Sequence, residues 1–174
     1  MKLTLIGYRG CGKSSVGPLL AESLGMGCVD SDERVEEVAG KSIQQIFSDD
    51  GEAEFRRLES QVIAELLLQP KTVLAAGGGA ILSEDNRICM QHAGPVVWLQ
   101  ASVETLASRI GGDKASATMR PSLTGRSILE EIAEVLEARR ELYKKASTMT
   151  VDTDNKDPQQ IADEIVTRLP GVNE

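Results

Sequence analysis

The chain has 174 residues, of which 41% are hydrophobic and 3% aromatic, and its formal net charge is −8. This size and apolar content predict a single domain over residues 1–174. The negative charge and the few rings argue against a nucleic-acid partner, because a phosphate backbone is repelled and bases have little to stack on. No apolar run is long enough to cross a bilayer, and Met1-Lys2 leads straight into a predicted strand, so we expect a cytoplasmic protein without a membrane partner.

Short apolar segments alternate with helical patterns along the chain. Strands are predicted at residues 2–6, 28–30, 72–76, 96–100 and 149–152. Helices are predicted at residues 14–24, 32–38, 43–47, 52–68, 83–91, 103–109, 128–145 and 158–168. This alternation predicts an α/β fold of three layers, in which helices cover both faces of a five-stranded parallel sheet.

The first predicted strand runs into the sequence Gly7-Tyr8-Arg9-Gly10-Cys11-Gly12-Lys13-Ser14. Glycines let such a loop curl until its N–H groups point inward, and the helix that follows adds its positive end. In this P-loop pattern the lysine reaches the β- and γ-phosphates of a nucleotide and the serine hydroxyl binds Mg²⁺. A glycine-rich turn that binds nothing is disfavoured by the strand before and the helix after. The expected nucleotide contacts are Gly10, Cys11, Gly12, Lys13, Ser14 and Ser15.

Two carboxylates follow the second predicted strand, in the sequence Asp30-Ser31-Asp32. Open α/β sheets place their ligand crevice at such strand ends, and alternation sends the two side chains in similar directions. We expect Asp30 to hold a Mg²⁺-bound water and Asp32 to orient an attacking hydroxyl. The alternative is that Asp32 simply caps the following helix, whereas capping is the weaker explanation for Asp30.

Gly77-Gly78-Gly79 ends the third predicted strand. Three successive glycines sacrifice conformational entropy and packing, which is expected where the backbone approaches a ligand or adopts conformations closed to other residues. We therefore expect an acceptor or phosphate contact here. Arg56 and Glu59, in contrast, share a face of a predicted helix, and such a pair taken alone is usually solvated or salt-bridged.

Two stretches break the alternation. Residues 111–126 are small and polar without a period, and we interpret them as a mobile lid of the kind that excludes water from phosphoryl transfer. A surface loop without a function is the alternative. Residues 33–62 include two short helical patterns around 40–51 and are interpreted as an insertion that binds a small acceptor.

These residues, in this order and spacing, resemble the shikimate kinase family. The likeness covers nearly the whole chain and rests on Asp30-Ser31-Asp32, Phe55-Arg56, Gly77-Gly78-Gly79, Arg120-Pro121 and Arg139 with Leu142-Tyr143 as well as on the P-loop. It implies a P-loop kinase fold with strand order 2-3-1-4-5. It also implies transfer of the γ-phosphoryl group of ATP, with Mg²⁺, to the 3-hydroxyl of shikimate in aromatic amino-acid biosynthesis.

The resemblance also implies roles for single residues on the acceptor side. Asp32 is placed on the shikimate hydroxyls, and Arg56 and Arg139 on the carboxylate, which charge-assisted, often bidentate hydrogen bonds can orient. The glycines Gly77, Gly78 and Gly79 lie against the acceptor in this scheme. Arg140 competes with Arg139 for its role, and Arg139 is preferred because it keeps the family spacing to Leu142-Tyr143.

On the donor side, the resemblance implies that Arg120 in the lid moves onto the phosphates and stabilises charge there. Arg109 and Pro158, with Lys156 at the border, are implied at the adenine, where a guanidinium plane and a proline can stack on the purine. Lys13, Asp32 and Arg120 are then the catalytic residues, and ATP and shikimate the small-molecule partners of an expected monomer. Two alternatives stay open: a kinase for another polyol acid such as gluconate, and a nucleotide-binding regulatory or scaffold module without catalysis.

Overall fold

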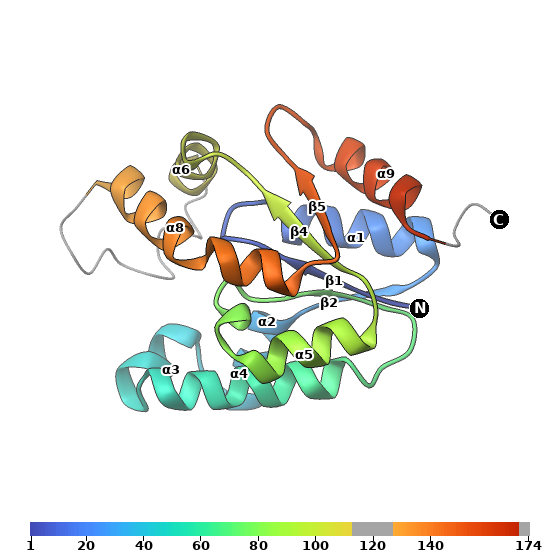
Figure 1. The fold of residues 1–174 in the computed structure, drawn as a ribbon. Helices are drawn as coiled ribbons and strands as arrows, with labels where there is room; N and C mark the ends of the chain where they lie inside the picture. The colour runs from blue at the N-terminus through green and yellow to red at the C-terminus, as the bar shows by residue number, and fades with distance from the viewer. Residues whose placement is uncertain (113–126, 171–174) are drawn as a thin grey trace.

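The computed structural model describes residues 1–112 and 127–170. Five parallel strands form one sheet in the order β2-β3-β1-β4-β5 (Figure 1). The strands are β1 (Lys2–Ile6), β2 (Gly27–Asp30), β3 (Thr72–Ala75), β4 (Val96–Gln100) and β5 (Met149–Asp152). The predicted fold class and strand order are therefore confirmed.

Helices cover both faces of this sheet. They are α1 (Lys13–Leu24), α2 (Ser31–Ala39), α3 (Ile43–Asp49), α4 (Glu52–Leu66), α5 (Glu84–Ala93), α6 (Val103–Gly112), α8 (Ile128–Ala146) and α9 (Pro158–Arg168), with a 3₁₀ turn η1 (Ala80–Leu82). Figure 1 shows α1 and α9 on one face, and α4 and α5 on the other. The turn η1 was not predicted, because a single 3₁₀ turn is too short to show a helical period.

The strands alternate their side chains between two separate cores. In β4, Val97 and Leu99 belong to the core under α1 and α9, whereas Val96 and Trp98 belong to the core under α4 and α5. A strand buried on both faces reads as a continuous apolar run, which explains why these short segments could be recognised without polar alternation.

Helix starts follow local capping chemistry. Ser42, Ser127 and Asp157 each open a helix with a capping box, in which the side chain and a residue three positions later satisfy each other's backbone N–H groups. Pro158 fills the first position of α9, where its missing N–H costs nothing. Within the described ranges, no helix combines the length and the apolar character needed to cross a membrane.

Candidate active site

The predicted site segments meet at the carboxyl ends of the three neighbouring strands β2, β3 and β1. The P-loop follows β1, α2 follows β2, and the three glycines follow β3. A cavity of about 580 Å³ opens at this edge. Its wall includes Arg9, Gly10, Cys11, Gly12, Lys13, Ser14, Ser15, Asp30, Asp32, Gly77, Gly78, Arg109, Lys156 and Pro158. This is the crevice position expected for a ligand of an open α/β sheet.

The P-loop adopts a conformation that depends on its glycines. Gly10 and Gly12 have φ angles of 81° and 106°, which other residues rarely adopt. The Lys13 ammonium folds back across the loop and donates to the carbonyl oxygens of Gly7 at 2.8 Å and Tyr8 at 3.2 Å. The loop thus holds a positive charge beside the start of α1, where backbone N–H groups favour an anion.

Asp30, and not Asp32, caps the N-terminus of α2. The Asp30 carboxylate accepts from the N–H groups of Asp32 at 2.8 Å and Glu33 at 3.4 Å, so Asp30 is the N-cap of α2. The interpretation of Asp32 as the cap is wrong, because the chain is still extended at Asp30 and the helix begins one residue earlier than predicted, at Ser31. Both carboxylates nevertheless line the cavity.

The three glycines are required because other groups lie against them. None of the three has a positive φ angle. A Cβ at Gly77 would overlap the Asp32 carboxylate, and one at Gly79 would lie 2.6 Å from Nη2 of Arg56. The buried Ser31 hydroxyl accepts from the Gly77 N–H at 2.9 Å and fixes α2 to the segment. The triplet is therefore a meeting point for side chains from α2 and α4.

We expect Gly79→Ala to lower the free energy of unfolding by about 1–3 kcal/mol, because the added methyl group displaces the flexible Arg56 guanidinium from the buried Glu59 carboxylate, which lies 2.7 Å away. Gly111→Ala is the matched control, since Gly111 lies in α6 and a Cβ there meets nothing within 4 Å. Urea denaturation of both variants measures the difference. A Gly79→Ala protein as stable as the wild type would contradict the close approach.

Arg56 is ion-paired to a buried carboxylate. Its Nη1 lies 2.7 Å from Oε2 of Glu59, whose side chain is only 2% exposed. Glu59 was not predicted as a site residue, although a signal was present: Glu59 lies on the apolar face of α4, four residues after Phe55 and three before Val62. An acidic residue on such a face needs a partner, and Arg56 is that partner.

Arg139 approaches the triplet from α8. Its Nη1 donates to the Gly78 carbonyl at 3.1 Å. Arg140 instead pairs with Glu137 at 3.1 Å and is 60% exposed. Arg56 and Arg139 do not form part of the cavity wall, but together with Asp32 they bring three charged side chains from three helices to one three-residue segment. The role of Arg139 at the substrate carboxylate stays a prediction.

The chain matches the model of the family described as shikimate kinase over residues 9–170. It belongs to the shikimate kinase family. It is 40% identical to the shikimate kinase of Rhodopirellula baltica, covering 97% of this chain and 90% of that protein, and 39% identical to that of Symbiobacterium thermophilum, covering 97% and 96%.

Solved structures agree with this family assignment. The shikimate kinase of Acinetobacter baumannii in complex with shikimate has a TM-score of 0.88 and 34% identity, covering 95% of this chain and 90% of that one. The shikimate kinase of Aquifex aeolicus has a TM-score of 0.82 and 35% identity, covering 96% and 95%. A gluconokinase from Sinorhizobium meliloti, at 23% identity and a TM-score of 0.59, shares the fold.

On the nucleotide side of this family site, Arg109 joins two loops. Its Nη1 donates to the carbonyls of Gly10 at 3.3 Å and Cys11 at 3.4 Å, and its Nη2 donates to the carbonyl of Thr153 at 3.0 Å. The P-loop is thus tied to the connection between β5 and α9, which leads into Pro158, the first residue of α9. All of these bonds are donated by N–H groups at the edge of the guanidinium plane.

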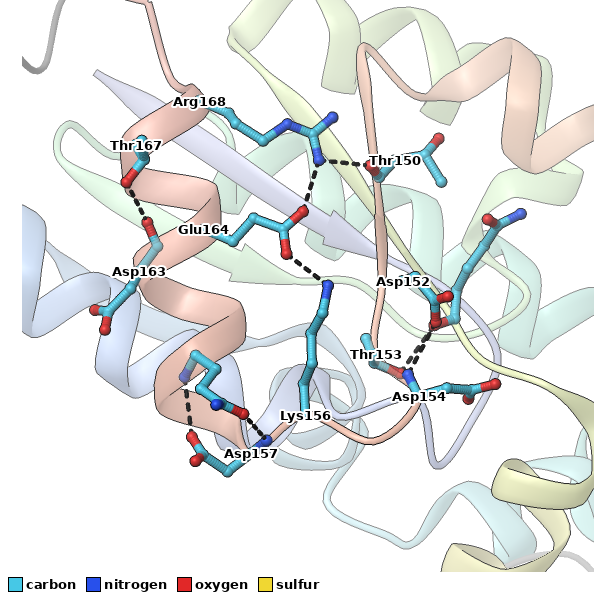
Figure 2. Close-up of polar contacts among 12 residues, drawn as sticks. Thr150, Asp152, Thr153, Asp154, Lys156, Asp157, Asp163, Glu164, Thr167 and Arg168 are labelled. Carbon is cyan, nitrogen blue, oxygen red and sulfur yellow. Dashed lines mark hydrogen bonds and ion pairs between the residues drawn. The ribbon is translucent and has the colours of Figure 1, made fainter.

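Lys156 lines the same cavity but already has a partner. Figure 2 shows its ammonium directed at Glu164 of α9, at 2.6 Å, while the second oxygen of Glu164 accepts from Arg168 at 3.0 Å. The hydrogen bond from Lys156 lowers the pKa of Glu164, so this carboxylate is ionised at neutral pH. Lys156 is therefore fixed to α9 at the edge of this cavity.

The cavity also offers oxygen ligands suited to Mg²⁺. The hydroxyl of Ser14, in the first turn of α1, and the carboxylate of Asp30 both line it. Mg²⁺ is commonly bound by one or two protein oxygens together with substrate phosphates and waters. The residues present fit the ion that the family implies.

Part of the predicted machinery lies outside the described residues. This applies to Arg120 and to residues 113–126 of the predicted lid. At the start of the predicted lid, α6 continues to Gly112, three residues further than predicted. Gly111 and Gly112 were assigned to the lid, but they form the end of α6. A Cβ at either position would meet nothing within 4 Å.

Proposed function

We propose that this chain transfers the γ-phosphoryl group of ATP to the 3-hydroxyl of shikimate and releases shikimate 3-phosphate and ADP. Family membership supports the reaction. The observation in the structure that carries the proposal is the meeting of Asp32, Arg56 and Arg139 at Gly77–Gly79, directly beside the P-loop. One carboxylate and two guanidinium groups suit an acceptor that has hydroxyl groups and a single carboxylate.

The acceptor site follows from these charges. We assign residues 33–62, which supply Arg56 from α4, to acceptor binding. Arg56 and Arg139 bind the carboxylate of shikimate and fix the ring, while Asp32 accepts a hydrogen bond from the attacking hydroxyl. The small ring has little area to bury, so charge-assisted hydrogen bonds orient it. Gly77 and Gly79 let the Asp32 carboxylate and the Arg56 guanidinium lie against the backbone at this site.

Phosphoryl transfer in such a site depends on positioning and charge. Lys13 interacts with the transferring phosphoryl group, and Asp32 accepts or orients the proton of the hydroxyl that attacks phosphorus. Ser14, and Asp30 through water, would hold Mg²⁺, which would supply charge neutralisation at the phosphates. Arg120 is assigned to the same phosphates. Arg109 and Pro158 are assigned to the two faces of adenine, with Lys156 at its edge.

The decisive test is ADP release measured with shikimate, quinate and gluconate in parallel, each with MgATP. We expect turnover with shikimate well above that with the other two acids. Gluconate as the preferred acceptor would overturn the substrate assignment, and ATP binding without acceptor-dependent ADP release would favour a regulatory module. Omitting Mg²⁺ should abolish turnover. Light scattering on the same preparation tests the proposed monomer.

We expect Arg56→Ala to raise KM for shikimate about 10- to 100-fold with a smaller change in KM for ATP, because a hydrogen bond to a charged group is lost on the acceptor side alone. Arg57→Ala is the matched control. Arg57 is the next residue of α4, but it is 59% exposed and pairs with Glu54 on the surface. Steady-state kinetics with each substrate varied separates the two effects. Equal effects of the two variants on KM for shikimate would contradict the assignment.

A further inference from the structure

The Gly78 carbonyl accepts two hydrogen bonds from α8. The Tyr143 hydroxyl donates to it at 2.8 Å and Nη1 of Arg139 at 3.1 Å. These two residues lie four positions apart, so they share one face of the helix. On its other side Gly78 lies against the P-loop, where a Cβ would be 3.5 Å from the Gly7 carbonyl oxygen and from the Arg9 nitrogen. Gly78 is thus enclosed between the nucleotide loop and α8.

Of the two donors, Tyr143 is the more rigid. Its side chain is fully buried, and its ring stacks on Trp98 of β4 with centroids 5.4 Å apart and an angle of 13° between the planes. Burial also raises the pKa of Tyr143, which keeps the hydroxyl protonated and able to donate at neutral pH. Arg139, in contrast, is partly exposed and has a long flexible stem.

The second hydrogen bond is not needed to satisfy the partly buried Gly78 carbonyl. The free-energy cost of a carbonyl oxygen that lacks a second donor is small, and Arg139 already supplies the first donor. The bond from Tyr143 instead fixes where the oxygen lies, and with it the backbone between the P-loop and the acceptor. When Arg139 also binds the substrate carboxylate, as proposed above, its N–H groups are divided between the Gly78 carbonyl and the ligand.

We propose that Tyr143 is a positioning residue of the acceptor site: its hydroxyl holds Gly78 in place between the P-loop and Arg139. This inference rests on the proposed function, because the acceptor is the ligand that Arg139 binds. Tyr143 itself touches no substrate. It acts through the Gly78 carbonyl, which sets the position of the Arg139 guanidinium and the gap across which the phosphoryl group is transferred.

Tyr143→Phe removes the hydroxyl and keeps the ring stacked on Trp98. We expect KM for shikimate to rise about fivefold, the effect of one neutral hydrogen bond. We expect kcat to fall as well, because alignment of the acceptor with the phosphorus loosens. KM for ATP should stay within about twofold of the wild-type value, since the P-loop has its own contacts with Lys13 and Arg109.

Thr72→Val is the matched control. The buried Thr72 hydroxyl donates to the Pro70 carbonyl at 3.1 Å at the opposite end of β3. This variant loses the same kind of bond, from a side-chain hydroxyl to a backbone carbonyl, at the start of β3 rather than beyond its end, and its KM for shikimate should match the wild type. A Thr72→Val protein with the Tyr143→Phe kinetics would overturn the inference, because the effect would then come from general loosening of β3.

A double-mutant cycle tests the route through Arg139. If Tyr143 positions Arg139, removing the hydroxyl in an Arg139→Ala background should change KM for shikimate less than it does in the wild type. Independent, multiplicative effects overturn the inference, as do wild-type kinetics in Tyr143→Phe, an equal rise in both KM values, or a variant that no longer folds. Failure of the wild-type protein to phosphorylate shikimate refutes the proposed function instead.

Discussion

Replacing Lys13 by alanine is expected to lower kcat about 10²- to 10³-fold, the usual loss when one preorganised donor to a developing negative charge is removed. Lys13 is the first residue of α1, and its ammonium lies over the P-loop carbonyls of Gly7 and Tyr8. A nucleotide phosphate offers this ammonium a charged partner in place of neutral carbonyls. The lysine therefore gains interaction as the phosphoryl group is transferred.

The Lys13→Ala effect should be confined to catalysis and phosphate binding. KM for shikimate should change far less than in Arg56→Ala, because Lys13 lies on the donor side of Gly78. Lys145→Ala is the control, since Lys145 is an exposed lysine in the last turn of α8. Denaturation curves of both variants check that the P-loop still folds without the ammonium. A kcat within about threefold of wild type would remove Lys13 from the mechanism.

Much of the fold could be predicted because the central strands β1, β3 and β4 are buried on both faces. An apolar run such as Val96–Gln100 indicates a buried strand by itself. The loop from Gly7 to Ser14 follows a motif in which glycines are required by positive φ angles of the loop. Helix ends were less predictable. Whether Asp30 or Asp32 caps α2 depends on where the extended backbone of β2 stops, and residue type does not decide between two aspartates so close together.

The site was harder to predict in its supporting contacts than in its charged groups. Asp32, Arg56 and Arg139 could be named from the family pattern. Their meeting point could not be worked out from spacing, because the triplet gathers side chains up to 61 residues away along the chain. Three glycines indicated a close approach, but not that the approaching groups are the protein's own Asp32 and Arg56.

Glu59 and Tyr143 show what sequence reasoning can and cannot find. Glu59 breaks the apolar face of α4, so its burial with a cationic partner could have been inferred from the helical period. Tyr143 fits an apolar position of α8 without any conflict. Nothing in its spacing indicates that the hydroxyl reaches Gly78, 65 residues earlier, so only the tertiary structure reveals this contact.

Asp32→Asn is expected to lower kcat by about 10²-fold or more, the range for loss of a positioned general base. Asparagine keeps the size of the side chain and an oxygen that accepts a hydrogen bond, so acceptor binding should be largely preserved. The negative charge and the ability to take a proton are lost. Because Gly77 leaves room for this side chain and α2 is fixed to Gly77 by Ser31, the replacement should not shift the backbone.

The control for Asp32→Asn is Asp85→Asn. Asp85 also lies in the first turn of a helix, α5, and is exposed, so both substitutions remove the same favourable interaction with a helix N-terminus. Of these two residues, Asp32 lines the cavity beside the P-loop and Asp85 does not. If Asp32 merely binds shikimate, its replacement raises KM and leaves kcat unchanged. If it takes the proton from the attacking hydroxyl, kcat falls while KM stays close to wild type. We expect this second result, because Asp32 lies beside Gly77.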